Sequence, residues 1–209
     1  MEKYTADRIV TINVDVQNDF LPSGALAVTD GDNVITPLNQ LNDFTRNNGG
    51  IVVATGDQHP TTTPHFEVWP VHCVAGSEGA SLSQELAIKA DDIIINKGMG
   101  QTDGYSAFEG VTDDGQTLEQ IITPLGRERV AAIFGGLATD YCVLNSVLDG
   151  LRVNKAQGEI RVFVAQDAVE AVNIQADDGQ KALTQMEEAG ATLVTTLEIL
   201  TKQAFQLAK

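Results

Sequence analysis

The 209-residue sequence has little positive charge and no long hydrophobic run. Lys and Arg number 13 against 29 Asp and Glu, so the formal net charge at pH 7 is −16. Such an acidic surface repels phosphate groups, and therefore neither a nucleic-acid partner nor an anionic membrane surface is expected. No segment approaches the roughly 18 apolar residues of a membrane-spanning helix. The first eight residues also lack the apolar core of a signal peptide, which predicts a cytoplasmic protein.

Cysteine and glycine-rich phosphate loops are also scarce. The two cysteines, Cys73 and Cys142, are predicted to be free thiols, as is usual in a reducing compartment. The chain has neither a G-x-G-x-x-G motif after a strand nor a G-x-x-x-x-G-K-[ST] motif, and this argues against dinucleotide and P-loop binding. Hydrophobic residues make up 43% and charged residues 20% of the chain. Length and composition together predict one globular domain over residues 1–209.

Strand-like and helix-like segments alternate along the chain. Runs of β-branched and apolar residues predict strands at 8–16, 51–55, 92–96, 129–134, 160–164 and 192–195. Helical spacing of apolar residues predicts helices at 32–47, 81–89, 116–124, 140–155, 177–189 and 197–207. This alternation predicts a three-layer α/β/α fold with a central, mostly parallel sheet of about six strands. The long irregular segment 56–80 is interpreted as a functional loop.

Four chemically capable residues follow four of the predicted strands. Asp15 ends the first strand, Asp57 follows the second, Lys97 follows the third, and Cys142 lies just past the fourth. In parallel sheets the ligand crevice lies beyond the carboxyl ends of the strands, so these residues are expected to meet there. If Thr139 caps a helix, Cys142 lies in its first turn, where the helix dipole favours the nucleophilic thiolate.

A nucleophilic thiol also needs a proton acceptor. Asp15 is a candidate base, and Lys97 could neutralise this carboxylate, which would otherwise be costly within an apolar strand. A cysteine–histidine pair is an alternative. A further alternative is an inert, buried Cys142 beside a structural ion pair of Asp15 and Lys97.

All three histidines of the chain fall within 14 positions. They are His59, His65 and His72, and Asp57 precedes the first of them by two residues. Imidazole and carboxylate groups suit one divalent metal ion such as zinc, iron or manganese. The alternative is that these histidines are ordinary polar residues of a loop.

Several segments, in order along the chain, resemble the motifs of one known family. They are Val14–Phe20 (VDVQNDF), Asp57–Pro60, Trp69–Cys73, Lys97–Gly98, Asp103–Phe108 and Gly136–Val143. The family is the isochorismatase-like cysteine hydrolases, and the chain is similar to its nicotinamidase (pyrazinamidase) branch over about residues 9 to 196. The resemblance implies that the single domain has the isochorismatase-like fold.

The resemblance also assigns roles to particular residues. It implies a catalytic triad of Asp15, Lys97 and Cys142, and an oxyanion hole formed by the backbone N–H groups of Ala138 and Cys142, with a cis peptide before Ala138. It implies that Asp57, His59 and His72 bind the metal, with His65 as a further ligand. Phe20, Trp69 and Tyr105 match positions that wall the substrate ring.

The activity implied by the resemblance is hydrolysis of a small heteroaromatic amide. Nicotinamide would give nicotinate and ammonia through a cysteine thioester, as a step of NAD salvage, and pyrazinamide would give pyrazinoate. The short segment Phe66–Val68 and the extra residue within Gly100–Thr102 depart from the family pattern at the border of the pocket. Two alternatives stay open: a cysteine amidase for N-carbamoyl or ureido substrates, and a non-catalytic metal- or ligand-binding module. The sequence also leaves open the identity of the metal and the formation of a homo-oligomer.

Overall fold

The centre of the molecule is a six-stranded parallel sheet. The computed structural model describes residues 3–157 and 159–208. The strands are β2 (Arg8–Val14), β3 (Ile51–Asp57), β4 (Ile93–Lys97), β5 (Val130–Leu137), β6 (Ile160–Glu170) and β7 (Thr192–Val194). They lie side by side in the order β4-β3-β2-β5-β6-β7, and every neighbouring pair is parallel. The six predicted strands and the parallel sheet are therefore confirmed.

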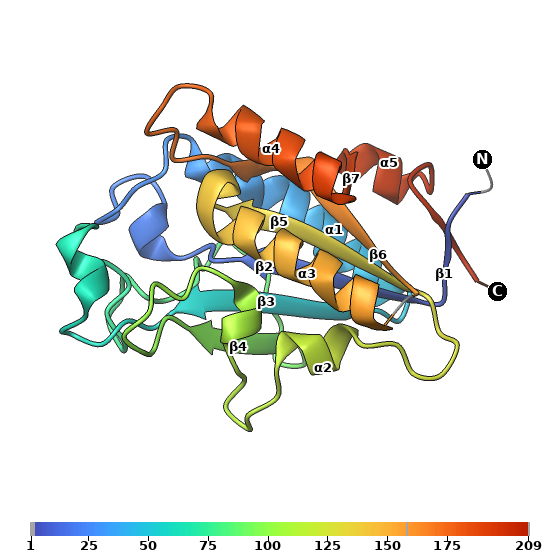
Figure 1. Cartoon of the computed structure of the whole chain (residues 1–209), viewed down its shortest axis with the longest axis horizontal. Helices are drawn as coiled ribbons and strands as arrows, with labels where there is room; N and C mark the ends of the chain where they lie inside the picture. Colours follow the sequence, from blue (N-terminus) through green and yellow to red (C-terminus); the bar gives the residue numbers. More distant parts are fainter. Residues whose placement is uncertain (1–2, 158, 209) are drawn as a thin grey trace.

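Helices cover both faces of this sheet (Figure 1). On one face lie α1 (Ile35–Asn47) and α5 (Thr196–Leu200), which contact each other. On the other face lie α2 (Leu118–Ile122), α3 (Leu144–Gln157) and α4 (Asp178–Ala189). The three-layer architecture agrees with the prediction. None of the helices in the described part of the chain is both long and apolar enough to cross a lipid bilayer.

The central strands are apolar along their whole length because both of their faces are buried. In β5, Val130, Ala132 and Phe134 pack into the core beneath α2, α3 and α4. Ala131 and Ile133, which alternate with them, pack into the core beneath α1 and α5. Successive side chains of a strand point to opposite faces, so one continuous apolar run supplies both cores.

The predicted helix at 81–89 is wrong. This segment follows the surface of α1 in an irregular path and hydrogen-bonds to a side chain of that helix: Asn39 donates from Nδ2 to Glu85 O and accepts from Ala87 N–H. Ser83 N–H donates to Val16 O. The polar groups of the backbone are therefore satisfied by tertiary contacts, and a local helix is not needed to satisfy them.

The predicted last helix, 197–207, is also too long. The helix ends at Leu200, and Lys202 adopts a left-handed conformation with φ of 57°. Phe205 then packs on Phe163 with ring centroids 5.1 Å apart. Near the C-terminal end, β8 (Gln206–Leu207) pairs with β1 (Thr5–Ala6), so these two short strands from opposite ends of the sequence lie side by side (Figure 1).

Gly136 shows how closely β2 and β5 approach each other at their carboxyl ends. Its φ is 118°, and a Cβ atom there would lie 2.1 Å from Val14 O. We expect Gly136→Ala to lower the free energy of unfolding by about 3 kcal/mol or more, since backbone strain and overpacking act together. Gly115→Ala is the matched control, because Gly115 also has a positive φ (86°) but has open space around it. Its expected cost is only about 1–2 kcal/mol.

Urea unfolding of the two variants measures this difference. Equal losses of stability would show that the contact with β2 does not constrain residue 136.

Candidate active site

The carboxyl ends of β2, β3, β4 and β5 bring three reactive side chains together around one lysine. Asp15 directly follows β2, whereas Asp57 and Lys97 are the paired last residues of β3 and β4. The ammonium group of Lys97 lies 2.8 Å from Asp15 Oδ2 and 2.7 Å from Asp57 Oδ1. It also lies 3.6 Å from Cys142 Sγ and donates to Gly104 O at 3.0 Å. Residues that the sequence predicts at one sheet edge therefore lie in direct contact.

Lys97 is fully buried between these groups. Burial alone would lower its pKa, but the carboxylates of Asp15 and Asp57 outweigh that effect and hold the pKa of Lys97 well above its ordinary value. Lys97 is therefore a permanent cation. It compensates the negative charges around it, which would be costly to bury unpaired.

The two carboxyl groups that share Lys97 have different pKa shifts. Burial raises the pKa of Asp15 above its ordinary value, although Lys97 and the Thr55 hydroxyl oppose the shift. Burial also acts on Asp57, but Lys97 and His59 outweigh it and lower the pKa of Asp57 to about 2. Divergent pKa values in one carboxyl pair are typical of an acid/base group beside a permanent anion. Asp15 is therefore the group suited to exchange a proton.

The local backbone fixes the position of the Asp15 carboxyl group. Asp15 has a φ of 49°, in the left-handed region that few residues other than glycine adopt. The Thr55 hydroxyl donates to Asp15 Oδ1 at 2.6 Å. A carboxylate oxygen of Asp15, one of Asp57 and the Cys142 sulfur all lie within 4.8 Å of one another. Asp15 is thus a candidate to take a proton from Cys142.

Cys142 lies in a π-helical turn, Thr139–Val143, that joins β5 to α3. The preceding peptide, Leu137–Ala138, is cis, as the family resemblance implies. The predicted cap is wrong: Ala138 occupies the cap position and Thr139 is the first residue of the turn. A regular α-helix begins only at Leu144.

Burial of Cys142 opposes the thiolate that the helix-dipole argument favours. Burial raises the pKa of the Cys142 thiol well above its ordinary value, and the carboxylates of Asp15 and Asp57 add to this effect while Lys97 opposes it. The thiol is therefore protonated at rest. Its activation needs a base within reach, and Asp15 is so placed.

Cys73 lies outside this group. Both cysteines are free thiols, as predicted, and both are buried. Cys73 packs in the core cluster that contains Phe20 and Ala80, and burial raises the pKa of its thiol. Such a thiol is inert.

The three histidines form a second cluster beside Asp57. One ring nitrogen from each of His59, His65 and His72 lies within 4.8 Å of the other two, and all three residues are buried. Each ring places Nδ1 against an oxygen outside the cluster: Gly98 O for His59 at 3.0 Å, Asp103 Oδ1 for His65 at 2.7 Å, and Pro70 O for His72 at 2.7 Å. With Nδ1 as the donor, each Nε2 keeps its lone pair for another ligand.

This cluster fits a divalent metal ion. His59 Nε2 is buried and has no hydrogen-bond partner among the described residues, and it lies 3.7 Å from Asp57 Oδ2. Burial lowers the pKa of His72, which favours the neutral imidazole that a metal requires. Three imidazoles and one anionic carboxylate are a donor set typical of zinc, iron or manganese.

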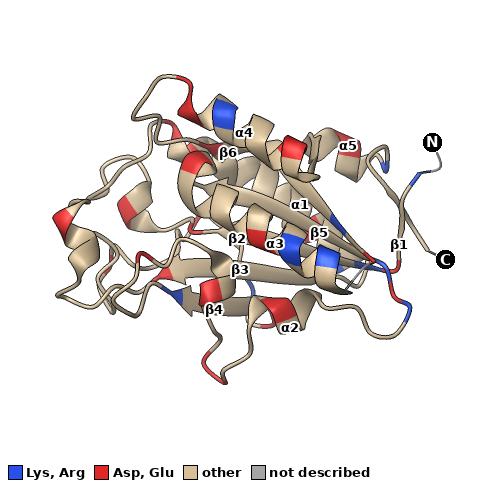
Figure 2. Ribbon diagram, viewed as in Figure 1, with Lys and Arg blue, Asp and Glu red and all other residues tan. Residues whose placement is uncertain are grey.

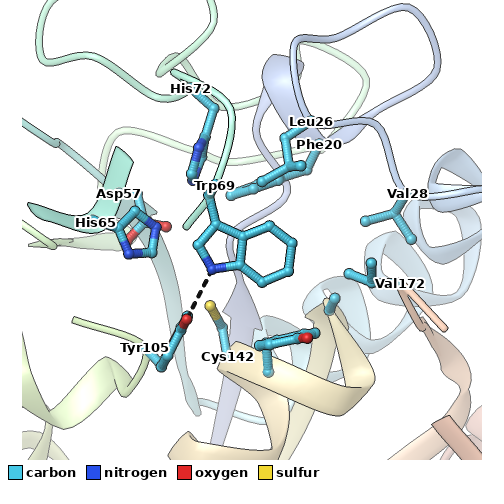
Figure 3. Close-up of a pocket in the computed structure, with 12 residues that line it drawn as sticks. Phe20, Leu26, Val28, Asp57, His65, Trp69, His72, Tyr105, Cys142 and Val172 are labelled. Atoms are coloured by element: carbon cyan, nitrogen blue, oxygen red, sulfur yellow. Dashed lines mark hydrogen bonds between the residues drawn. The ribbon is translucent and has the colours of Figure 1, made fainter. Parts of the chain in front are cut away.

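A pocket opens between Cys142 and the histidine cluster. Phe20, Trp69 and Tyr105, the three predicted ring contacts, all line it. Figure 3 shows the Trp69 indole beside the Cys142 sulfur, with His65, His72 and Asp57 toward one end and Val28 and Val172 toward the other. The Trp69 Nε1–H donates to the Tyr105 hydroxyl at 2.9 Å. The pocket therefore offers an aromatic surface to a ring, with the Cys142 thiol on one side and potential metal ligands at one end.

Four further lining residues are absent from the sequence prediction: Leu26, Val28, Tyr141 and Val172. Tyr141 stands edge-on to Trp69, with ring centroids 5.0 Å apart. In the sequence, only its position directly before Cys142 could have indicated that it lines the pocket. Val172 is held at the pocket by Asp140, whose carboxylate accepts the backbone N–H groups of Val172 and Asn173 at 2.9 Å each. No local pattern marks that contact.

The described lining of the pocket contains neither arginine nor lysine. In Figure 2 most of the basic segments lie toward the chain termini, and the buried Lys97 is the basic residue at the carboxyl end of β4. An anionic substrate would find no cationic side chain in the lining. The pocket is therefore better suited to a neutral substrate.

Comparisons with known proteins agree with this geometry. An isochorismatase domain model matches residues 10–198. The chain is 37% identical to the nicotinamidase of Escherichia coli (strain K12), and the match covers 87% of this chain and 92% of that relative. Its structure is similar to the crystal structure of the pyrazinamidase of Pyrococcus horikoshii in complex with zinc, with a TM-score of 0.77, 33% identity, and coverage of 90% of this chain and 99% of the other. It is also similar to PnC1 from L. infantum in complex with nicotinate, with a TM-score of 0.77, 28% identity and 99% coverage of both chains.

Proposed function

The chain belongs to the isochorismatase family. From this premise we propose that it is an amide hydrolase that converts nicotinamide to nicotinate and ammonia. This reaction is a step of NAD salvage. The observation that carries the proposal is the contact of Lys97 with both Asp15 and Cys142, at the edge of an aromatic pocket. The curated relative from E. coli is a nicotinamidase and the L. infantum structure contains nicotinate, which supports the choice of substrate. Pyrazinamide, a ring of similar size and polarity, is the expected second substrate.

In the first half of the reaction, Asp15 takes the thiol proton while the Cys142 sulfur attacks the carboxamide carbon. The negative charge that develops on the amide oxygen is stabilised by the backbone N–H groups of Ala138 and Cys142, which form the oxyanion hole. Lys97 holds Asp15 in place. Protonated Asp15 then gives its proton to the leaving nitrogen, the carbon–nitrogen bond breaks, ammonia departs, and a thioester to Cys142 remains.

In the second half, Asp15 acts as a base again. It takes a proton from a water molecule, whose oxygen attacks the thioester carbonyl carbon. The carbon–sulfur bond breaks, and the proton held by Asp15 returns to the Cys142 sulfur. The product leaves as nicotinate, because its carboxyl proton passes to water or to the released ammonia. The acidic surface repels this anionic product and so favours its release.

Asp57, His59, His65 and His72 would hold one divalent metal ion. When bound, the metal supplies a Lewis-acid site that can bind the pyridine nitrogen and orient the ring. Zinc, iron and manganese all accept this donor set, and the similar structure from P. horikoshii contains zinc. Trp69 and Phe20 would hold the ring so that its amide carbon faces Cys142.

The two alternative functions fit the site less well. An N-carbamoyl or ureido acid carries a carboxylate, and no arginine or lysine of the described lining could bind it. A non-catalytic binding module has no need of a buried thiol beside a carboxyl group with a raised pKa. Ammonia release on addition of nicotinamide tests the proposal against both alternatives, because neither predicts it.

Removal of the metal should affect nicotinamide and benzamide differently. Dialysis against a chelator is expected to lower turnover of nicotinamide by about 10²-fold, the usual cost of a misplaced substrate. Benzamide has no ring nitrogen, so its turnover should be low with the metal and change little without it. Addition of zinc to the dialysed protein should restore nicotinamide turnover. Equal proportional losses for the two amides would instead assign the metal to activation of water.

A further inference from the structure

His65 differs from the other two imidazoles of the cluster in the group that orients it. His59 and His72 direct Nδ1 to backbone carbonyl groups, Gly98 O and Pro70 O. His65 directs Nδ1 to a side chain, the carboxylate of Asp103, at 2.7 Å. The side chain of His65 is only 3% exposed and that of Asp103 is 53% exposed. An anion at the surface is thus connected to the buried cluster through one hydrogen bond.

The backbone around Asp103 fixes this contact. Gly98 and Gly104 both have a positive φ, 65° and 66°, and a Cβ atom on Gly104 would lie 2.6 Å from Gly98 Cα. The loop therefore closes tightly on itself, and Gly104 O accepts a hydrogen bond from the buried Lys97 ammonium at 3.0 Å. Asp103, which directly precedes Gly104, is held against His65 by the same closure.

The inference that follows rests on the metal site proposed above. We propose that Asp103 is a positioning residue for the metal, acting through His65. Its carboxylate accepts the Nδ1–H of His65, which fixes the ring orientation and keeps the ring in the tautomer with a free Nε2. A backbone carbonyl fixes a tautomer in the same way but adds no net negative charge. His65 is therefore the imidazole of the cluster whose orientation and tautomer depend on a replaceable carboxylate.

The expected effect is on metal affinity. Loss of such a carboxylate partner typically weakens metal binding by about 10–100-fold. Asp103→Ala removes the acceptor and the charge, and it should reach the upper part of this range. Asp103→Asn keeps an acceptor oxygen of similar shape without the charge, and about 10-fold is expected.

The experiment measures zinc affinity of the metal-free full-length chain by competition with a chromophoric chelator. The variants are Asp103→Ala, Asp103→Asn, His65→Asn and the double variant of His65→Asn with Asp103→Ala. Asp91→Asn is the matched control, since it removes one negative charge from an exposed position before β4. Melting temperatures of the metal-free variants identify any that are misfolded. Absorption spectra of the cobalt-loaded proteins provide a second readout, because Co²⁺ bands report the ligand set directly.

The expected result is weaker zinc binding and a changed cobalt spectrum in Asp103→Ala, with Asp91→Asn like the wild type. In the His65→Asn background, Asp103→Ala should have no further effect, because the residue through which it acts is gone. An unchanged affinity in Asp103→Ala would overturn the inference and leave the metal site standing. An equal loss of zinc affinity from Asp103→Ala in the wild-type chain and in the His65→Asn background would also overturn the inference. A wild-type chain that binds no stoichiometric metal would overturn the metal site itself.

Discussion

Replacing Cys142 by alanine is expected to reduce turnover of nicotinamide at least about 10⁴-fold, the scale on which enzymes lose activity when their nucleophile is removed. The buried sulfur lies beside Lys97 and within 4.8 Å of a carboxylate oxygen of Asp15. The pocket lining contains no second cysteine, serine or threonine among the described residues. Without this sulfur the thioester cannot form. The measurement is ammonia release under saturating nicotinamide.

Cys73→Ala is the matched control for this prediction. Cys73 is buried and directly follows His72, but it does not line the pocket, and its sulfur faces Gly79 O at 4.0 Å. We expect this variant to retain most of its activity. Both variants should keep their metal content and fold, since each removes one small group. An active Cys142→Ala protein together with an inactive Cys73→Ala protein would show that the nucleophile is Cys73.

Asp15→Asn has the second largest expected effect. The amide has nearly the shape of the carboxyl group but cannot take the Cys142 proton, and loss of a general base usually costs about 10²–10⁴-fold in rate. Because burial raises the pKa of the Cys142 thiol, little thiolate forms without a base. The rate constant kcat for nicotinamide should therefore fall, and alkylation of Cys142 by iodoacetamide at neutral pH should slow in parallel.

Thr55→Val provides the comparison for Asp15→Asn. It removes the hydroxyl that donates to Asp15 Oδ1 at 2.6 Å and leaves the carboxyl group in place. Loss of this hydrogen bond should lower kcat by about 10-fold or less, in line with its usual worth of about 1 kcal/mol. Near-normal turnover by Asp15→Asn would show that another group deprotonates Cys142.

The order of secondary-structure elements could be predicted because it depends on local patterns. Each buried parallel strand is a continuous apolar run, and each of the longer helices has an apolar face at helical spacing. The wrong predictions fall where tertiary contacts replace local structure. Residues 81–89 hydrogen-bond to Asn39 of α1 and form no helix, and Phe205 packs on Phe163 in a segment predicted to be helical.

The protonated state of Cys142 could not be predicted from its position in the chain. The stabilisation of a thiolate by a helix dipole depends only on the local turn that follows Thr139. The pKa of the thiol is raised by burial and is further affected by the opposing charges of Asp15, Asp57 and Lys97, which lie at the ends of three other strands. These charges lie far from Cys142 in the sequence, so only the folded chain determines their distances.

The sequence by itself determined the parallel α/β architecture and the placement of Asp15, Asp57, Lys97 and Cys142 at one edge of the sheet. The physical reason is that parallel strands have their carboxyl ends on the same side, so residues at the ends of consecutive strands must meet there. Only the tertiary structure decided which residues complete the pocket and the histidine cluster. Val172 reaches the pocket through Asp140, 32 positions away, and Asp103 reaches His65 across 38 positions. Such contacts depend on how loops close over the sheet, and local hydrophobic patterns do not specify that closure.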